Sequence, residues 1–492
     1  MGEEVELVRF TPEHRQRYRE KVRRCVEVLR HMVEQDRFEP HRDRIGLELE
    51  IYLVDRDGTP MMINTEVLSR IESAAFQTEL AQFNIEFNLP PHEVEARVFR
   101  TLEDELNGCL GHALKRAAEL HARIVIVGIL PTLRDLHVTQ ENLTRNPRYQ
   151  LLNEQILAAR GENLQIDIAG AERLTLSASS IALESASTSM QLHMQVGPHW
   201  FARYWNAAAA ISAPLLAVGC NSPFLLGRQL WHETRIALFE QSTDTRTAEL
   251  AAQGVRPRVW FGERWIDGVV DLFEENARYF PALLPIIDDE DPFEVLERDG
   301  TPRLRELTLL NGTIWRWNRP VYAVANGQAH LRLENRVLPA GPSVVDAIAN
   351  AVFYYGLLRS VAAEEAPISE RLSFNVASDN FFAAARDGIL AELLWPGREP
   401  LPASELVLRH LLPLAHDGLE GWNIDELDRA HYLGIIEGRC LSRRTGASWQ
   451  VATFRHLHER CGLARHDALL EMTRRYLELM EANEPVHTWP LD

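Results

Sequence analysis

Residues 44–55 read RIGLELEIYLVD, and this stretch sets the interpretation of the rest of the chain. Successive side chains of a β-strand point to opposite faces of a sheet. The leucines and the isoleucine at positions 47 to 51 therefore share one face, whereas Glu48 and Glu50 share the other. We predict a strand with one apolar face and one acidic face.

Three further segments, residues 82–89, 190–196 and 331–338, repeat this pattern. Taken singly, each is compatible with an antiparallel strand that has one face in water. Strand faces that only meet water are poor in Glu and Asn, however, and favour Thr and aromatic residues. Together the segments predict a shared concave site. Their polar residues are Gln82, Asn84, Glu86, Asn88, Gln191, His193, Gln195, Arg332, Glu334 and Arg336.

Several carboxylates on one face repel one another unless a cation neutralises them. Oxygen ligands favour Mg²⁺, and an imidazole is accommodated more readily when the ion is Mn²⁺. Arg332 and Arg336 supply planar donors that suit phosphate oxygens. The chain has no Walker glycine loop and no GxGxxG motif. We therefore expect metals and arginines, rather than a backbone cradle, to hold a nucleotide triphosphate.

The organisation predicted for the chain is one large α+β domain over residues 1–492, without a low-complexity linker or an internal repeat. Residues 11–36 form an N-terminal amphipathic helix, because Thr11-Pro12 is a typical helix start. Residues 41–342 form the sheet-bearing core. Residues 343–492 form a mainly helical C-terminal portion.

Composition excludes several classes of function. Asp and Glu outnumber Lys and Arg by 71 to 52, so the net charge is −19, which disfavours nucleic acid as a partner. The five cysteines are scattered, which signals neither a disulfide framework nor a thiolate metal site. No apolar run approaches the roughly 18 residues that span a bilayer, and residues 1–10 lack the apolar segment of a signal peptide. We expect a cytoplasmic protein that does not bind membranes.

Eight segments between about residues 44 and 452 resemble the glutamate-cysteine ligase family, in the bacterial carboxylate-amine ligase branch related to glutamine synthetase. The resemblance implies a twisted antiparallel sheet whose concave face binds ATP and two or three magnesium ions. Helices would cover the convex side. The segments are GLELEIYLVD, ELAQFNIEFNLPP, VIVGILPT, STSMQLHMQV, NSPFLLG, TIWRWNRP, RLENRVLPAGPSVVDAIA and RRTGASWQ.

The resemblance also assigns roles to residues. The implied metal ligands are Glu48, Glu50, Glu79, Glu86, His193 and Glu334. The implied nucleotide ligands are Arg332, Arg336, His193, Gln191 and Gln195, with the two arginines also acting in catalysis. The implied substrate ligands are Arg235 and Asn84.

The implied reaction is attack of a substrate carboxylate on the terminal phosphoryl group of ATP, followed by attack of an amine on the acyl phosphate, which gives a γ-glutamyl type of amide. Two alternatives stay open: a phosphotransferase on the same scaffold, and an inactive nucleotide or metabolite sensor.

Gln191 and Gln195 replace an expected His-x-His-like element, and Leu338-Pro339 replaces an expected aspartate. The sequence therefore leaves the acid, the amine and any homo-oligomer undecided.

Simpler interpretations compete with some of these assignments. Glu79 is also compatible with a charge that closes a helix, and Arg235 with surface pairing to Glu233. His456 and His458 superficially suggest zinc, but residues two apart diverge on a helix, so we do not predict that site.

Overall fold

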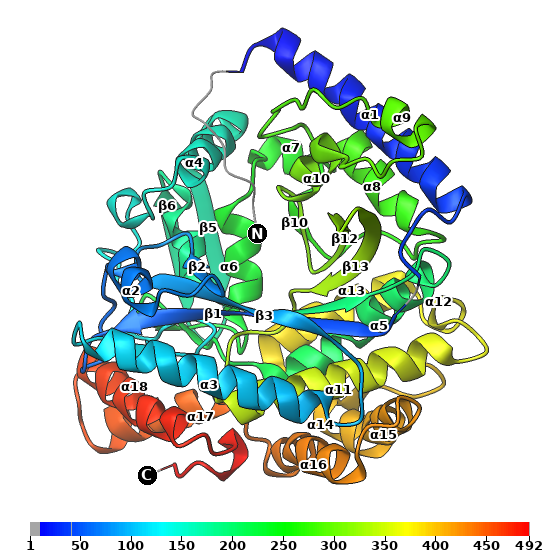
Figure 1. The fold of residues 1–492 in the computed structure, drawn as a ribbon. Coiled ribbons are helices and arrows are strands. Elements are labelled where there is room, and N and C mark those ends of the chain that lie inside the picture. Colours follow the sequence, from blue (N-terminus) through cyan, green and yellow to red (C-terminus); the bar gives the residue numbers. More distant parts are fainter. Residues whose placement is uncertain (1–9, 41, 492) are drawn as a thin grey trace.

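The structure is a computed structural model that describes residues 10–40 and 42–491, so the prediction made for residues 1–10 lies largely outside the described residues. Its centre is a seven-stranded antiparallel sheet, in which the strand order is β12-β13-β7-β1-β3-β2 and β4 also pairs with β1 (Figure 1). The strands of this sheet are β1 (Arg44–Val54), β2 (Phe76–Thr78), β3 (Asn84–Glu93), β4 (Arg123–Val125), β7 (Met190–Gln195), β12 (Asn318–Ala325) and β13 (Gln328–Asn335).

The register of the sheet places the predicted polar residues of neighbouring strands side by side. Residues that lie opposite one another on adjacent strands project to the same face. The polar face expected from the alternation of the four segments is therefore present. Its cross-strand pairs are Glu50 with Glu86, Glu48 with Gln191, His193 with Glu334, and Gln195 with Arg332.

Helices cover the opposite, apolar face of the sheet, as expected. In Figure 1, α3 (Val98–Ala118) and α11 (Val344–Ala363) lie beneath the strands. The hydroxyl of Tyr355 in α11 donates hydrogen bonds to the backbone oxygens of Gly46 (3.2 Å) and His193 (2.8 Å). These bonds join α11 to β1 and β7, directly behind the polar face.

Helix α11 is long and apolar enough to cross a membrane by length and composition, and no other described helix meets that test. Its apolar window is 89% buried inside the fold. Interior helices of globular proteins are apolar all round for this reason. Its composition is therefore accounted for by its central position against the sheet, α3 and α5 (Phe201–Gly219).

The N-terminal helix is present as predicted. It is α1 (Pro12–Glu34), and the side chain of Thr11 caps it by accepting a hydrogen bond from the His14 N–H. It lies on the side of the sheet away from α3 and α11, beside α8 (Val269–Tyr279), α9 (Pro292–Glu297) and α10 (Arg305–Asn311) (Figure 1).

The remaining elements are shorter helices and two-stranded ribbons around this centre. The helices are α2 (Asn64–Ile71), α4 (Pro147–Arg160), α6 (Thr234–Ser242), α7 (Ala248–Ala252), α12 (Ile368–Arg371), α13 (Phe374–Asp387), α14 (Ala403–Leu406), α15 (Leu412–Glu420), α16 (Glu426–Ser442), α17 (Gly446–Arg455) and α18 (Arg465–Glu481). The ribbons are β5 (Leu164–Ala169) with β6 (Arg173–Ala178), β8 (Phe224–Leu225) with β9 (Arg228–Gln229), β10 (Val259–Trp260) with β11 (Trp315–Arg316), and β14 (Glu392–Leu393) with β15 (Leu401–Pro402).

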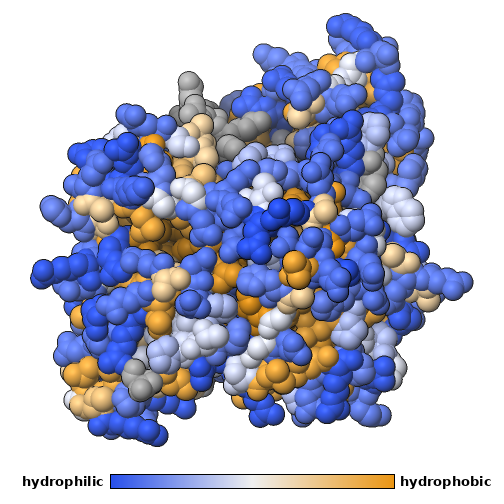
Figure 2. Space-filling model, turned by 60° about the horizontal axis from the view of Figure 1, so that its bottom comes forward, coloured by the Kyte–Doolittle hydropathy of each residue, from blue (hydrophilic) through white to orange (hydrophobic). Residues whose placement is uncertain are grey.

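Residues after 343 are mainly helical, as expected, and they lie on the α11 side of the sheet (Figure 1). Figure 2 brings this side forward and shows a surface dominated by hydrophilic side chains, with apolar side chains exposed in patches between them. The described part of the chain contains one dominant hydrophobic cluster, which extends from Tyr18 of α1 to Trp489.

Two strand predictions differ from the structure. The apolar run IVIVGIL at residues 124–130 also predicts a strand, but only residues 123–125 form one. The following backbone bonds to loops instead: Gly128 N–H donates to Asn221 O, and Gly128 O accepts from the Thr188 N–H. The strand expected to end at Leu89 continues to Glu93, through two prolines. The β1–β3 register shifts at this point, and bulges tolerate proline.

Candidate active site

A cavity of about 590 Å³ lies over the polar face of the sheet. Its other walls come from α4, α10 and the short 3₁₀ helix Ile181–Ala186. Most of the residues predicted for the site line it, whereas Gln82, Asn88, Gln195 and Arg235 are not among its lining residues. The predicted residues that line the cavity are Glu48, Glu50, Glu79, Asn84, Glu86, Gln191, His193, Arg332, Glu334 and Arg336.

Three of the predicted metal ligands converge. Oxygen atoms of Glu50, Glu79 and Glu86 all lie within 4.8 Å of one another, and among the described residues no other group of three or more acidic, histidine or cysteine side chains is this compact. Burial and the charge of Glu86 raise the pKa of Glu50 to about 7, although Arg336 opposes the shift. Burial and the same neighbour raise the pKa of Glu79 well above its ordinary value. The charge of Arg336 therefore does not offset the burial and mutual repulsion of these carboxylates.

The surrounding residues fix two of these carboxylates. Glu50 accepts hydrogen bonds from the Ser189 N–H (2.6 Å) and from Nε2 of Gln191 (3.0 Å). Glu86 accepts from the carboxamides of Gln77 and Asn88. Preorganised oxygen ligands of this kind suit a hard divalent cation, so the donor set fits magnesium.

The other predicted metal ligands form a neighbouring group. Nε2 of His193 lies 3.2 Å from Oε1 of Glu48, but neither ring nitrogen of this buried histidine has a hydrogen-bond partner among the described residues. Burial opposes ionisation of Glu48, yet His193 holds the pKa of Glu48 at about 2. His193 is therefore paired with Glu48 through Nε2, and its Nδ1 faces no partner among the described residues.

Glu334 is held by two arginines. Arg319 donates to its Oε2 (2.7 Å), and Nη1 of Arg336 donates to its Oε1 (2.7 Å). Burial disfavours its charge, but these two guanidinium groups hold the pKa of Glu334 well below its ordinary value. Nη1 of Arg336 also donates to Oε1 of Gln191 (2.5 Å), so the strands β13 and β7 are linked inside the cavity.

Arg332 differs from its neighbours. It lines the cavity, and its guanidinium makes no hydrogen bond or ion pair with any residue that the structure describes. Glu48 and Glu334 attract its charge, while burial lowers the pKa of Arg332. This guanidinium is available to an anionic ligand.

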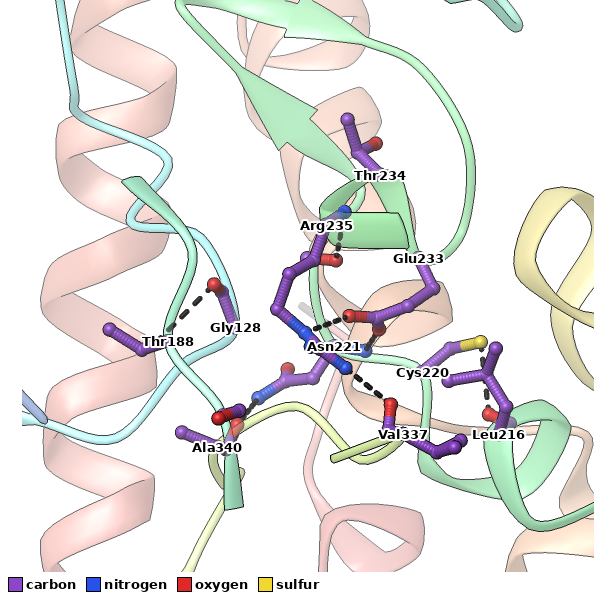
Figure 3. Close-up of polar contacts among 12 residues, drawn as sticks. Gly128, Thr188, Leu216, Cys220, Asn221, Glu233, Thr234, Arg235, Val337 and Ala340 are labelled. Carbon is purple, nitrogen blue, oxygen red and sulfur yellow. Dashed lines mark hydrogen bonds and ion pairs between the residues drawn. The ribbon is translucent and has the colours of Figure 1, made fainter. Parts of the chain in front are cut away.

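The four predicted residues outside the cavity lining have partners elsewhere. Gln82 donates to the backbone oxygens of Glu141 and Leu143, and Asn88 donates to Glu86. Gln195 donates to Oε2 of Glu39 (3.3 Å). Arg235 is buried beside Glu233, with 3.0 Å between Nε and Oε1, and it donates to the backbone oxygen of Val337 (Figure 3). It also donates to the backbone oxygen of Arg336. In this geometry Arg235 supports the backbone that follows β13 instead of facing the cavity.

Some cavity residues were not predicted from the sequence. Arg319 lies on β12, which was missed although Asn326-Gly327 after it is a strong hairpin signal. Both residues of this turn have positive φ, 52° and 77°, as the tight turns that connect hairpin strands require. Glu184 and Ser187 lie on or beside a 3₁₀ helix that has no sequence periodicity.

Known proteins resemble this chain in sequence and in fold. The sequence model of glutamate-cysteine ligase family 2 (GCS2) matches residues 44–452. No curated protein sequence matches the chain.

Two solved structures share the fold at 12% identity. A glutamate–cysteine ligase from Francisella tularensis in complex with AMP has a TM-score of 0.50, with 92% of this chain and 91% of that chain covered. A bifunctional glutathione synthetase from Pasteurella multocida has a TM-score of 0.51, with 93% of this chain but 55% of that longer chain covered. At this identity the similarity shows the fold.

Proposed function

Because the chain belongs to glutamate-cysteine ligase family 2, and is therefore an ATP-dependent carboxylate-amine ligase of that type, we propose that it forms a γ-glutamyl type of amide through an acyl phosphate in the cavity described above. The carboxylate of one substrate would attack the terminal phosphoryl group of ATP, which releases ADP. An amine would then displace phosphate and leave an amide. The observation that carries this proposal is the convergence of Glu50, Glu79 and Glu86 in a cavity that Arg332 also lines.

Glu50, Glu79 and Glu86 are the residues proposed to hold magnesium, and Glu48, His193 and Glu334 are proposed as ligands of further ions. The ions would neutralise the carboxylates and withdraw electrons from the phosphate oxygens. Ser189 and Gln191 orient Glu50, so the ligand geometry exists before a substrate arrives. Little reorganisation is then needed at the moment of reaction.

In this proposal, Arg332 and Arg336 have different roles toward the phosphate groups. Arg332 is free to contact phosphate oxygens, whereas Arg336 is oriented by Glu334 and Gln191. A fixed guanidinium beside a transferring phosphoryl group stabilises the charge that develops there. We assign Arg235, which had been expected to bind substrate, to positioning Arg336 through its bond to the Arg336 backbone oxygen.

The proposal also includes a cytoplasmic location. All five cysteines are unpaired, and three of them, Cys25, Cys220 and Cys440, are buried. Unpaired buried thiols are typical of proteins that function in a reducing compartment.

The experiment is ADP release with ATP, Mg²⁺, L-glutamate and a panel of amines, with mass spectrometry of the products. We expect ADP release that requires an amine, together with a product of amide mass. Glu50→Gln should lower kcat/KM by roughly 100-fold, since it removes a charged metal ligand. Glu154→Gln, on the exposed face of α4, is the matched control and should behave as the wild type.

Two outcomes would contradict the proposal. ADP release that is the same with and without every amine, together with a phosphorylated product, would indicate a phosphotransferase. Binding of ATP without turnover would indicate a sensor.

A further inference from the structure

The wall of the cavity at the β3 end carries oxygen atoms that have no protein donor. Asn84 is 2% exposed, and its Nδ2 donates to the backbone oxygen of Ser185 (2.9 Å). A carbonyl oxygen can only accept, so the amide nitrogen must face Ser185 and the orientation of the amide is fixed. Oδ1 of Asn84 is therefore a buried acceptor, and it has no partner among the described residues.

The 3₁₀ helix next to Asn84 adds two more groups. The carboxylate of Glu184 lines the cavity and makes no hydrogen bond or ion pair with any described residue. The hydroxyl oxygen of Ser187 is buried and also has no partner in the described part of the chain.

Arg319 and Arg332 lie at the other end of the cavity, whereas Arg336 lies between the two ends, because its charge acts on both Glu50 and Glu184. Arg319, Arg332 and Arg336 come from β12, β13 and the residue after β13, whereas Asn84 comes from β3. Strands β7 and β1 lie between β13 and β3 in the sheet. On the helical side, the guanidinium of Arg148 lies beside Gly312. The cavity therefore has a donor-rich end and an acceptor-rich end, and a ligand that spans it needs an anionic group at the first end and a donor group at the second.

We propose that Asn84, Glu184 and Ser187 form a subsite for the primary ammonium group of a substrate. An ammonium group has three N–H donors and no acceptor, which matches three acceptors that lack donors, one of them a carboxylate. The inference rests on the proposed function for the identity of the reaction, although the binding site itself does not depend on turnover. The ammonium group has two possible sources: the α-amino group of the acid that is activated, or the amine that is joined to it.

Binding to pairs of compounds that differ only in the ammonium group tests the proposal. Isothermal titration in the presence of Mg²⁺ and a nonhydrolysable ATP analogue compares L-glutamate with glutarate, and L-cysteine with 3-mercaptopropionate. The wild type should bind the ammonium-bearing member of one pair more tightly. The pair that shows the difference identifies the source. A charged hydrogen-bonded contact of this kind is worth about 10- to 100-fold in affinity.

Glu184→Gln should abolish this preference while it leaves the affinity for the ammonium-free compound within about twofold. Ser187→Ala, which removes one neutral acceptor, should weaken the preference less. Glu154→Gln is the control, and thermal unfolding of each variant reports its fold. The Mg²⁺ concentration that half-saturates the thermal stabilisation should not change in Glu184→Gln.

The inference is overturned if the wild type binds neither ammonium-bearing compound more tightly than its partner, or if Glu184→Gln retains the preference. It is also overturned if that variant changes only the Mg²⁺ requirement, which would make Glu184 a metal ligand. Failure of the proposed function appears separately, as the absence of amide product in the turnover assay.

Discussion

At the scale of the single residue, the site combines carboxylates that repel one another with two arginines, Arg319 and Arg336, that are already paired with Glu334. Glu334 has two guanidinium partners, whereas Glu50 and Glu79 have raised pKa values because burial and mutual repulsion disfavour their charge. This difference within one cavity is the one that the proposed magnesium site requires, because a bound cation would offset the repulsion at Glu50 and Glu79.

The raised pKa of Glu50 predicts how pH and magnesium affect stability. Without metal, folded Glu50 keeps its proton up to about pH 7, whereas an unfolded glutamate loses it near its ordinary value of 4.5. The folded state then binds more protons in this window, so the contribution is fully present below pH 4.5 and is lost as the pH rises to 7. At most about 3 kcal/mol is involved for a shift of this size.

The free energy of unfolding of the metal-free protein should therefore fall between pH 5.5 and 7.5 by more in the wild type than in Glu50→Gln. Mg²⁺ requires the deprotonated carboxylates, so its stabilising effect should be larger at pH 7.5 than at pH 5.5. Denaturant titrations at both pH values, with and without Mg²⁺, measure this. Equal pH dependence in the two proteins would contradict the explanation.

Alternation along strands was enough to predict Glu48, Glu50, Glu86, His193 and Glu334 as members of one face, because the period of two fixes the side on which each residue lies. Glu184 could not be found in this way. It lies on a 3₁₀ helix and reaches the cavity only through the contact between that segment and Asn84, which is 100 positions away in the sequence.

At the scale of the element, the end of β13 depends on a buried ion pair. Arg235 and Glu233 begin α6, and Arg235 donates to the backbone oxygens of Arg336 and Val337, which fixes the direction in which the chain leaves the strand (Figure 3). Glu233 in turn accepts from the Asn221 N–H (2.9 Å). The sequence shows only an arginine two residues from a glutamate, and it does not reveal that both are buried.

Arg235→Met should lower the free energy of unfolding by about 3–5 kcal/mol, because it leaves Glu233 as an unpaired buried charge. The double variant Glu233→Gln/Arg235→Met removes that charge and should be less destabilised than Arg235→Met alone. Denaturant unfolding of the two single variants and the double variant gives the coupling energy. If the double variant loses the sum of the two single losses, the residues do not act as a pair.

The sheet order is the feature of the fold that a single sequence reveals least. Alternation predicts strands, but β1 lies between β3 and β7, and the partner positions Glu48 and Gln191 are more than 140 residues apart. Strand β12 was also missed, and with it Arg319, although the hairpin it forms with β13 is local. The resemblance implied an antiparallel sheet, but neither the resemblance nor the alternation predicted which strands pair.

At the scale of the whole molecule, Asn221 joins the loop behind the site to the C-terminal helices. Its Nδ2 donates to Ala340 O (2.8 Å) and to the hydroxyl of Tyr476 in α18 (2.9 Å), and its Oδ1 accepts from Gln450 in α17 (2.9 Å). Gly446, the first residue of α17, packs directly against the Asn221 amide. The prediction that residues 343–492 belong to the same domain as the core can be tested at this junction.

A side chain at position 446 would collide with the Asn221 amide and would come within 2.9 Å of Cγ of Pro342. Gly446→Ala should therefore lower the free energy of unfolding by about 1–3 kcal/mol, the usual cost of overpacking. Gly434→Ala in α16 is the matched control, since its Cβ meets no atom within 4 Å and alanine favours helix interiors by about 0.5–1 kcal/mol.

If the chain unfolds as one domain, thermal scans should show Gly446→Ala shifting the loss of ADP-release activity and the loss of helical circular dichroism together. A shift of the circular dichroism transition alone, with activity lost at the wild-type temperature, would show that the C-terminal helices unfold independently of the site.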